Sequence, residues 1–191
     1  MKMINFNNAE FVKSAFSKED HLLDLPQILF IGKSNVGKSS LINALTDRKN
    51  LAYISKKPGQ TKLVNYYLIN KKFYLVDVPG FGYRKIAREK DAFEEMMEGY
   101  FSSNTSLKAV FYLIDSRREL LDEEFENMDF IKNMNLPLYL VFTKCDKLNQ
   151  SEKAKLINSI KKHSIDNYLF VSINNKSYLE KLKECISLII E

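Results

Sequence analysis

The run at residues 32–39 constrains the fold more than any other stretch of the sequence. It reads Gly-x-x-x-x-Gly-Lys-Ser and stands between an apolar segment at 27–31 and a helix-forming segment at 38–45. A strand, a glycine-rich loop and a helix in this order are the setting of a phosphate-binding loop. Backbone N–H groups of such a loop converge on phosphate oxygens, and the helix dipole adds positive potential. The sequence therefore predicts an α/β fold with a phosphate site at this turn.

Each residue type in this phosphate loop has a physical role. Gly32 and Gly37 allow the turns that point N–H groups inward. Lys38 can reach the outer phosphates, and the Ser39 hydroxyl can ligate Mg²⁺. An ordinary glycine-rich turn before a helix is the alternative, which the flanking segments disfavour. The expected phosphate-binding residues are Gly32, Lys33, Ser34, Asn35, Val36, Gly37, Lys38, Ser39 and Ser40.

Composition limits the remaining possibilities. The 191 residues fit one domain, 1–191, and we expect 1–25 to be an N-terminal extension with an edge strand. The formal net charge of +5 suits a polyanion such as RNA, and equally a solvated lysine-rich surface. Cys145 and Cys185 have no metal-binding spacing, so we expect neither a zinc site nor a disulfide framework. No targeting or membrane-spanning run occurs, so a cytoplasmic protein with no membrane partner is expected.

Apolar segments alternate with amphipathic ones along the chain, and the strand candidates are continuously apolar. This pattern predicts a three-layer α/β fold of the P-loop type, with a mainly parallel sheet, one antiparallel edge hairpin and helices on both faces. Ser151 is the expected N-cap of one helix. Strands are expected at 6–16, 27–31, 63–69, 73–77, 109–114, 138–142 and 168–171, and helices at 38–45, 91–101, 121–134, 151–161 and 178–190.

Asp77 ends an expected strand and is followed by Val78, Pro79 and Gly80. An acidic residue at this place can hold Mg²⁺ through water, and the Gly80 N–H can contact a terminal phosphate. In isolation, Asp-x-Pro-Gly is as typical of a β-turn as of a Mg²⁺ and phosphate site.

The segment of Gly59, Gln60 and Thr61 lies in the long loop before the expected hairpin. Its threonine could offer a hydroxyl to Mg²⁺ and an N–H to the terminal phosphate. We therefore expect these three residues to contact nucleotide and Ser39, Thr61 and Asp77 to hold the metal. Threonines are common in loops, so this signal is weak by itself.

A third motif, Thr143-Lys144-Cys145-Asp146, follows an apolar strand. The Asp146 carboxylate can accept hydrogen bonds from both N1–H and the 2-amino group of guanine, a donor pair that adenine lacks. The Lys144 stem can lie along the base. Ser172 and Ile173 end the last strand, where N–H groups could contact guanine O6. In isolation, Thr143-Lys144-Cys145-Asp146 would be typical of a polar helix start after a strand.

The ordered set of motifs resembles the translation-factor-related P-loop GTPases. Within that class, residues 34–43, 48–52, 57–61 and 76–83 resemble the EngB (YihA/YsxC) family, and the resemblance covers nearly the whole chain. It implies a cytoplasmic protein that binds GTP or GDP with Mg²⁺ and assists assembly of the large ribosomal subunit. It also implies a need for the protein in cell division and septation. Lys33 stands where the family usually has Arg, and Ile173 replaces a small residue.

Ribosomal RNA and proteins are the expected partners, with no DNA, and a monomer is expected. The basic residues proposed to contact rRNA are Lys56, Lys57, Lys62, Arg84, Lys85, Arg88 and Lys90.

Phe81 follows Gly80, where Ras-like enzymes place the glutamine that orients water. Phenylalanine cannot do this, so slow hydrolysis is expected from a catalytic set of Lys38, Thr61, Gly80 and Asn35. Asn35 either helps to hold K⁺ against the phosphates or only caps the loop. Two other functions stay open: a nucleotide-gated scaffold with negligible hydrolysis, and a P-loop nucleotide kinase.

Overall fold

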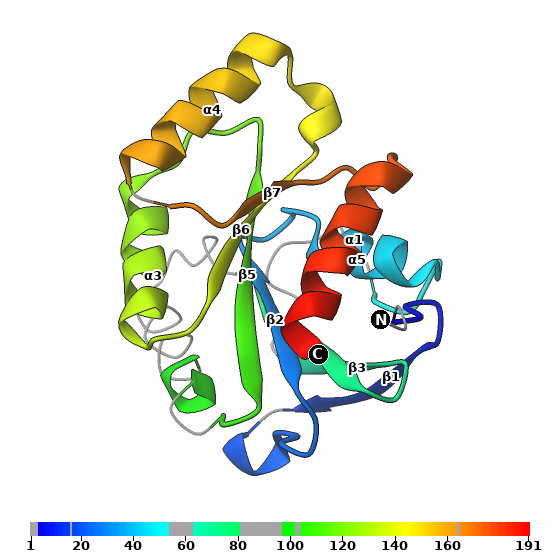
Figure 1. Ribbon diagram of the computed structural model, residues 1–191. Helices are drawn as coiled ribbons and strands as arrows, with labels where there is room; N and C mark the ends of the chain where they lie inside the picture. The colour runs from blue at the N-terminus through cyan, green and yellow to red at the C-terminus, as the bar shows by residue number, and fades with distance from the viewer. Residues whose placement is uncertain (1–3, 16, 54–62, 81–96, 102–103, 164) are drawn as a thin grey trace.

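The computed structural model describes residues 4–15, 17–53, 63–80, 97–101, 104–163 and 165–191 (Figure 1). Its seven strands form one sheet in the order β1-β3-β4-β2-β5-β6-β7. β3 runs antiparallel to both of its neighbours, and the other four pairings are parallel. The strands are β1 Ala9–Ala15, β2 Gln27–Gly32, β3 Val64–Ile69, β4 Phe73–Asp77, β5 Leu107–Asp115, β6 Leu138–Thr143 and β7 Tyr168–Phe170. The expected mainly parallel sheet is confirmed, and β1 forms the edge beyond the β3–β4 hairpin.

Helices cover both faces of this sheet. α1 and α5 pack on one face, and α3, α4 and the helical residues 97–101 pack on the other (Figure 1). The helices are α1 Lys38–Thr46, α3 Asp122–Asn133, α4 Gln150–Lys162 and α5 Lys176–Ile190, with 3-10 turns η1 Lys18–Asp20 and η2 Cys145–Lys147. Among the described residues, no helix combines the length and apolarity that crossing a membrane requires.

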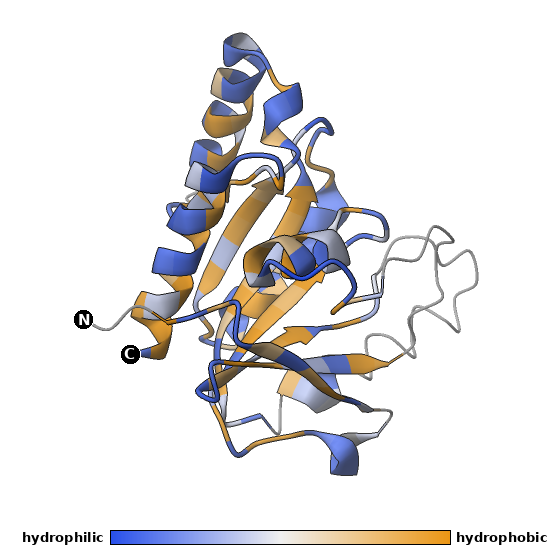
Figure 2. Cartoon of the chain, turned by 90° about the vertical axis from the view of Figure 1, so that its right-hand side faces the viewer, coloured by the Kyte–Doolittle hydropathy of each residue, from blue (hydrophilic) through white to orange (hydrophobic). Residues whose placement is uncertain are grey.

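The central strands are apolar on both sides because both sides are buried. All six residues of β2 are buried, and eight of the nine in β5 are buried as well. Figure 2 shows these strands as a hydrophobic layer between mixed-character helices. Full burial of a large apolar side chain contributes roughly 1.5–3 kcal/mol, so this layer is the main source of stability.

One capping prediction is wrong. α4 begins at Gln150, and its cap is Asn149 rather than Ser151. The Asn149 Oδ1 accepts from the Glu152 N–H at 2.9 Å, and the Glu152 carboxylate accepts from the Asn149 N–H at 2.8 Å. This reciprocal pair satisfies two N–H groups that would otherwise lack partners, which a serine placed inside the first turn cannot do.

Candidate functional site

The phosphate loop, residues 32–39, leaves the carboxyl end of β2 and enters α1. A Cβ on Gly32 would lie 2.6 Å from the Leu113 carbonyl oxygen, so only glycine allows β2 and β5 to approach this closely. Gly37 has φ of 107° and Asn35 has φ of 63°, both in the left-handed region. Glycine and asparagine tolerate this region better than other residues, so the sequence matches the turn.

Lys38 is buried beside this loop, and its Nζ donates to the Gly32 carbonyl oxygen at 3.3 Å. Burial lowers the pKa of Lys38, and the nearby Asp77 carboxylate opposes that effect. A desolvated ammonium next to the backbone of a glycine-rich loop is suited to receive phosphate oxygens.

Ser39 and Asp77 face each other at the ends of adjacent elements. The Ser39 hydroxyl donates to Asp77 Oδ2 at 3.4 Å, while the buried Oδ1 has no hydrogen-bond partner among the described residues. Burial raises the pKa of Asp77, and Lys38 and Ser39 act in the opposite direction. An incompletely satisfied carboxylate beside a hydroxyl fits the oxygen ligation that Mg²⁺ prefers.

The segment after β4 lies against the phosphate loop. A Cβ on Gly80 would lie 2.8 Å from both the Cα and the N of Ser34, so this approach also requires glycine. The Ser34 hydroxyl donates to the Gly80 carbonyl oxygen at 3.4 Å. Val78 and Pro79 are buried between Asp77 and Gly80. The structure thus brings the 77–80 motif against the phosphate loop.

The 143–146 motif reaches the same loop from β6. The Thr143 hydroxyl lies 2.9 Å from the Val36 carbonyl oxygen, and the Lys144 Nζ donates to the Asn35 carbonyl oxygen at 3.2 Å. The Lys144 ammonium also pairs with Asp115 at 2.8 Å. Two motifs far apart in sequence are therefore joined directly.

Asp146 is exposed in the middle of η2, where Lys147 pairs with it at 3.3 Å. A hydrogen bond from Ser172 is the main cause that lowers the pKa of Asp146, so the carboxylate is charged at neutral pH. Ser172 is buried, and Ile173 is half exposed. The predicted residues Gly59, Gln60, Thr61 and Phe81 and the basic residues beside them lie outside the described residues.

Sequence reasoning missed two acidic groups at this edge. Asp115 ends β5 and accepts two hydrogen bonds, of 2.9 and 2.7 Å, from the Arg117 side chain. Glu124 of α3, together with Glu123, pairs with Lys33 at 3.4 and 3.3 Å. A polar residue at a strand's carboxyl end was the available signal for Asp115.

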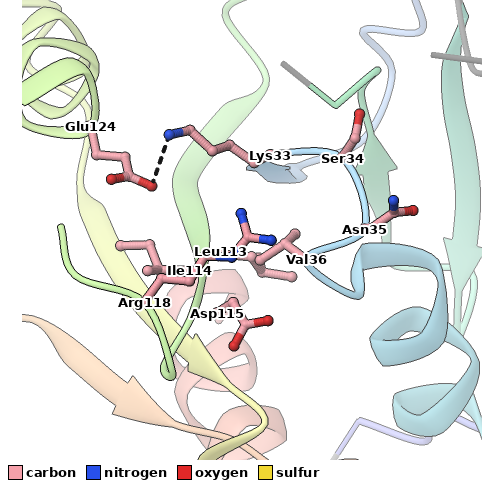
Figure 3. Close-up of a pocket in the computed structure, with 9 residues that line it drawn as sticks. All are labelled: Lys33, Ser34, Asn35, Val36, Leu113, Ile114, Asp115, Arg118 and Glu124. Atoms are coloured by element: carbon pink, nitrogen blue, oxygen red, sulfur yellow. Dashed lines mark ion pairs between the residues drawn. The ribbon is translucent and has the colours of Figure 1, made fainter. Parts of the chain in front are cut away.

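Asp115 and Glu124 line one pocket beside the loop, shown with the Lys33–Glu124 ion pair in Figure 3. Its residues are Lys33, Ser34, Asn35, Val36, Leu113, Ile114, Asp115, Arg118 and Glu124.

Comparison with known proteins decides the family. Residues 27–144 match the sequence profile described as "50S ribosome-binding GTPase". The "Probable GTP-binding protein EngB" of Thermoanaerobacter pseudethanolicus is 44% identical over 82% of this chain and 83% of its own length. The chain belongs to the EngB family of GTP-binding proteins. Other EngB proteins agree: that of Lactobacillus helveticus is 41% identical over 92% of this chain and 90% of its own length.

Solved structures show the same fold. A crystal structure of a probable EngB protein superposes with a TM-score of 0.69 and 23% identity, covering 86% of this chain and 98% of that one. A single-residue variant of Aquifex aeolicus Era bound to GDP·AlF4⁻ gives a TM-score of 0.64 and 27% identity, covering 87% of this chain and 56% of that one. The P-loop GTPase fold of this EngB-family chain is therefore established.

Proposed function

We propose that this EngB-family chain binds GTP and GDP with Mg²⁺ and works as a nucleotide-dependent switch in assembly of the large ribosomal subunit. The observation that carries the nucleotide site is the Lys144 ammonium, which bonds to the Asn35 carbonyl of the phosphate loop at 3.2 Å. It places the 143–146 motif beside the loop, as one ligand with a base and phosphates requires. Family membership supports guanine as the base.

The residues divide the binding work. Lys38 and the N–H groups of the phosphate loop hold phosphates, and Asp146 selects guanine with support from Ser172. The Lys144 stem lies along the base, and Ile173 belongs to the segment facing guanine O6. Gly80 senses the terminal phosphate.

Mg²⁺ would be held by Ser39 and Thr61, with Asp77 acting through water. When bound, this ion neutralises charge that develops between the outer phosphates. The orphan Oδ1 of Asp77 is the observation that fits such a group.

Hydrolysis is proposed to be slow, because Phe81 cannot orient water as a glutamine does. Asn35 is proposed to hold K⁺ against the phosphates. Turnover should be faster in K⁺ than in Na⁺, and Asn35→Ala should remove the difference. Equal rates in both salts would remove K⁺ from the scheme.

A nucleotide-gated scaffold is the second candidate, and Phe81 favours it. Single-turnover hydrolysis with and without large ribosomal subunits separates the two. Stimulation by the subunit supports a GTPase, and no hydrolysis in either condition supports the scaffold.

Base specificity tests the central proposal. GTP and GDP should displace a fluorescent GDP analogue, and ATP should not, which also separates this function from that of a kinase. Asp146→Asn replaces one acceptor by a donor and should shift preference toward xanthine nucleotides, whose 2-oxo group accepts. Retained guanine preference in that variant would contradict the role of Asp146, and equal ATP binding by the wild type would reject the function.

The ribosomal role is tested by recovery of partners from cell extract with GTP- and GDP-loaded protein. We propose that the chain acts in the cytoplasm as a monomer, with no DNA or membrane partner, and that loss of the protein disturbs septation. Charge reversal at Arg84 and Lys85 should weaken salt-sensitive binding to the large subunit. Unchanged binding would remove these two residues from the interface.

A further inference from the structure

Asp115 occupies the end of β5, between the phosphate loop and the 143–146 motif. It is only 6% exposed. One edge of its carboxylate is held by the Arg117 side chain, with Nε on Oδ1 at 2.9 Å and Nη2 on Oδ2 at 2.7 Å. The same Oδ2 accepts from the Lys144 Nζ at 2.8 Å. Burial opposes ionisation, but the hydrogen bonds from Arg117 and Lys144 lower the pKa of Asp115, so it is an anion at neutral pH.

The Lys144 ammonium has a second acceptor, the Asn35 carbonyl oxygen at 3.2 Å. A lysine stem has four rotatable bonds, and an ammonium has no fixed direction of its own. Two acceptors on different elements restrict it to one position. The Asp115 carboxylate is buried and held by Arg117. Lys144 is bound to this carboxylate, so its second bond, to the Asn35 carbonyl, fixes where the phosphate loop lies relative to β6.

We propose that Asp115 is a positioning residue for guanine nucleotide binding, orienting Lys144 so that the phosphate loop and the 143–146 motif form one prearranged site. The inference rests on the proposed binding of GTP and GDP. Asp115 acts through Lys144 and does not itself touch nucleotide. In a prearranged site, the entropy cost of ordering the side chains is met during folding rather than during binding. Loss of that arrangement therefore weakens nucleotide binding without removing a contact to the nucleotide. GDP and GTP share the base and the inner phosphates, so both should be affected by the same factor.

A double-mutant cycle on nucleotide affinity tests this arrangement. Asp115→Asn keeps the shape of the side chain, and Lys144→Met keeps most of the stem without the ammonium. We expect Asp115→Asn to raise the dissociation constant for a fluorescent GDP analogue about tenfold. In the Lys144→Met background, Asp115→Asn should raise the dissociation constant by less than about twofold, because the ammonium through which Asp115 acts is gone. A purely structural role would cost the same factor in both backgrounds, and that result would overturn the proposal.

Asp20→Asn is the matched control, because Asp20 also pairs with a lysine, Lys13, at 3.3 Å but in the β1–η1 region. It should bind as the wild type does. If Asp115→Asn does not fold, Asp115→Glu enters the same cycle, with about threefold loss expected only when Lys144 is present. Wild-type protein that binds no guanine nucleotide would reject the proposed function. Tight binding by the wild type and equally by Asp115→Asn would reject only the role of Asp115.

Discussion

The Ser39 hydroxyl donates to Asp77 Oδ2 across 3.4 Å, and the opposite oxygen of this buried carboxylate has no hydrogen-bond partner among the described residues. The pair is thus costly without a cation and well placed to support one. Burial raises the pKa of Asp77 above 3.8, which means that folding favours its protonated form. The stability that Asp77 contributes is fully present below pH 3.8, and it is lost as the pH rises through the pKa of Asp77 in the folded protein.

Asp77→Asn should therefore stabilise the nucleotide-free protein and weaken its use of Mg²⁺. The neutral amide mimics the protonated acid, so the free energy of unfolding of nucleotide-free protein should rise at pH 7. The Mg²⁺ concentration needed for tight GDP binding should rise about tenfold or more. Urea unfolding without nucleotide and Mg²⁺ titrations of GDP binding measure the two effects. An unchanged Mg²⁺ requirement would contradict the role given to Asp77.

Lys38 provides a pH dependence of the opposite sign. Burial lowers its pKa below 10.5, against the attraction of Asp77, so the unfolded chain binds the proton more tightly. The free energy of unfolding contributed by Lys38 should therefore rise with pH between its folded pKa and 10.5. Lys38→Met should lack this rise and should weaken GTP binding about 100-fold. Unfolding of nucleotide-free wild type and variant across this range provides the comparison, and parallel pH profiles would contradict the burial of a charged Lys38.

Glycine at position 80 is required by the approach of two backbones. Gly80→Ala should destabilise the protein by about 1–3 kcal/mol and weaken GDP binding, since the new Cβ meets the Ser34 backbone. Ser34→Ala in the same chain removes the hydroxyl oxygen that the new Cβ would meet at 2.9 Å, but it should not restore affinity, because the Ser34 Cα and N at 2.8 Å remain in the way. Gly37→Ala has free space but strained φ, so it should cost about 1–2 kcal/mol through the backbone alone. Thermal unfolding and GDP titration of these three variants provide the test, and recovery of wild-type binding by the double variant would refute the backbone conflict.

The sequence predicts the parts of this fold that depend on local pattern. The apolar strand at 27–31 and the loop glycines carry their own signals, because burial on both faces and positive φ restrict residue type. Asp115 carries only the weaker signal of a polar residue at a strand's carboxyl end, because its role depends on Lys144, which follows the neighbouring strand β6. Asn149 and Ser151 are both residue types that suit an N-cap, so the sequence alone does not choose between them. The path of the chain out of η2 makes Asn149 the cap of α4.

Asn43 is another residue whose role only the tertiary structure reveals. It lies on α1, is 7% exposed, and its amide bonds to the loop that follows the helix. Its Oδ1 accepts from the Ala52 N–H at 2.7 Å, and its Nδ2 donates to the carbonyls of Ala52 and Lys49 at 2.9 and 3.4 Å. This amide fixes the chain immediately before the segment that contains Thr61.

Asn43→Ala should lower the free energy of unfolding by about 2–3 kcal/mol, because it leaves buried backbone groups without partners. Asn43→Asp should cost at least as much, since a carboxylate keeps the acceptor for Ala52 but turns an oxygen toward two carbonyls. Asn65→Ala, which removes an acceptor that the Ser14 hydroxyl bonds at 2.6 Å, is the control and should cost about 1 kcal/mol. Urea unfolding of the three variants measures these differences. Equal losses for Asn43→Ala and Asn65→Ala would show that the amide does not hold this loop.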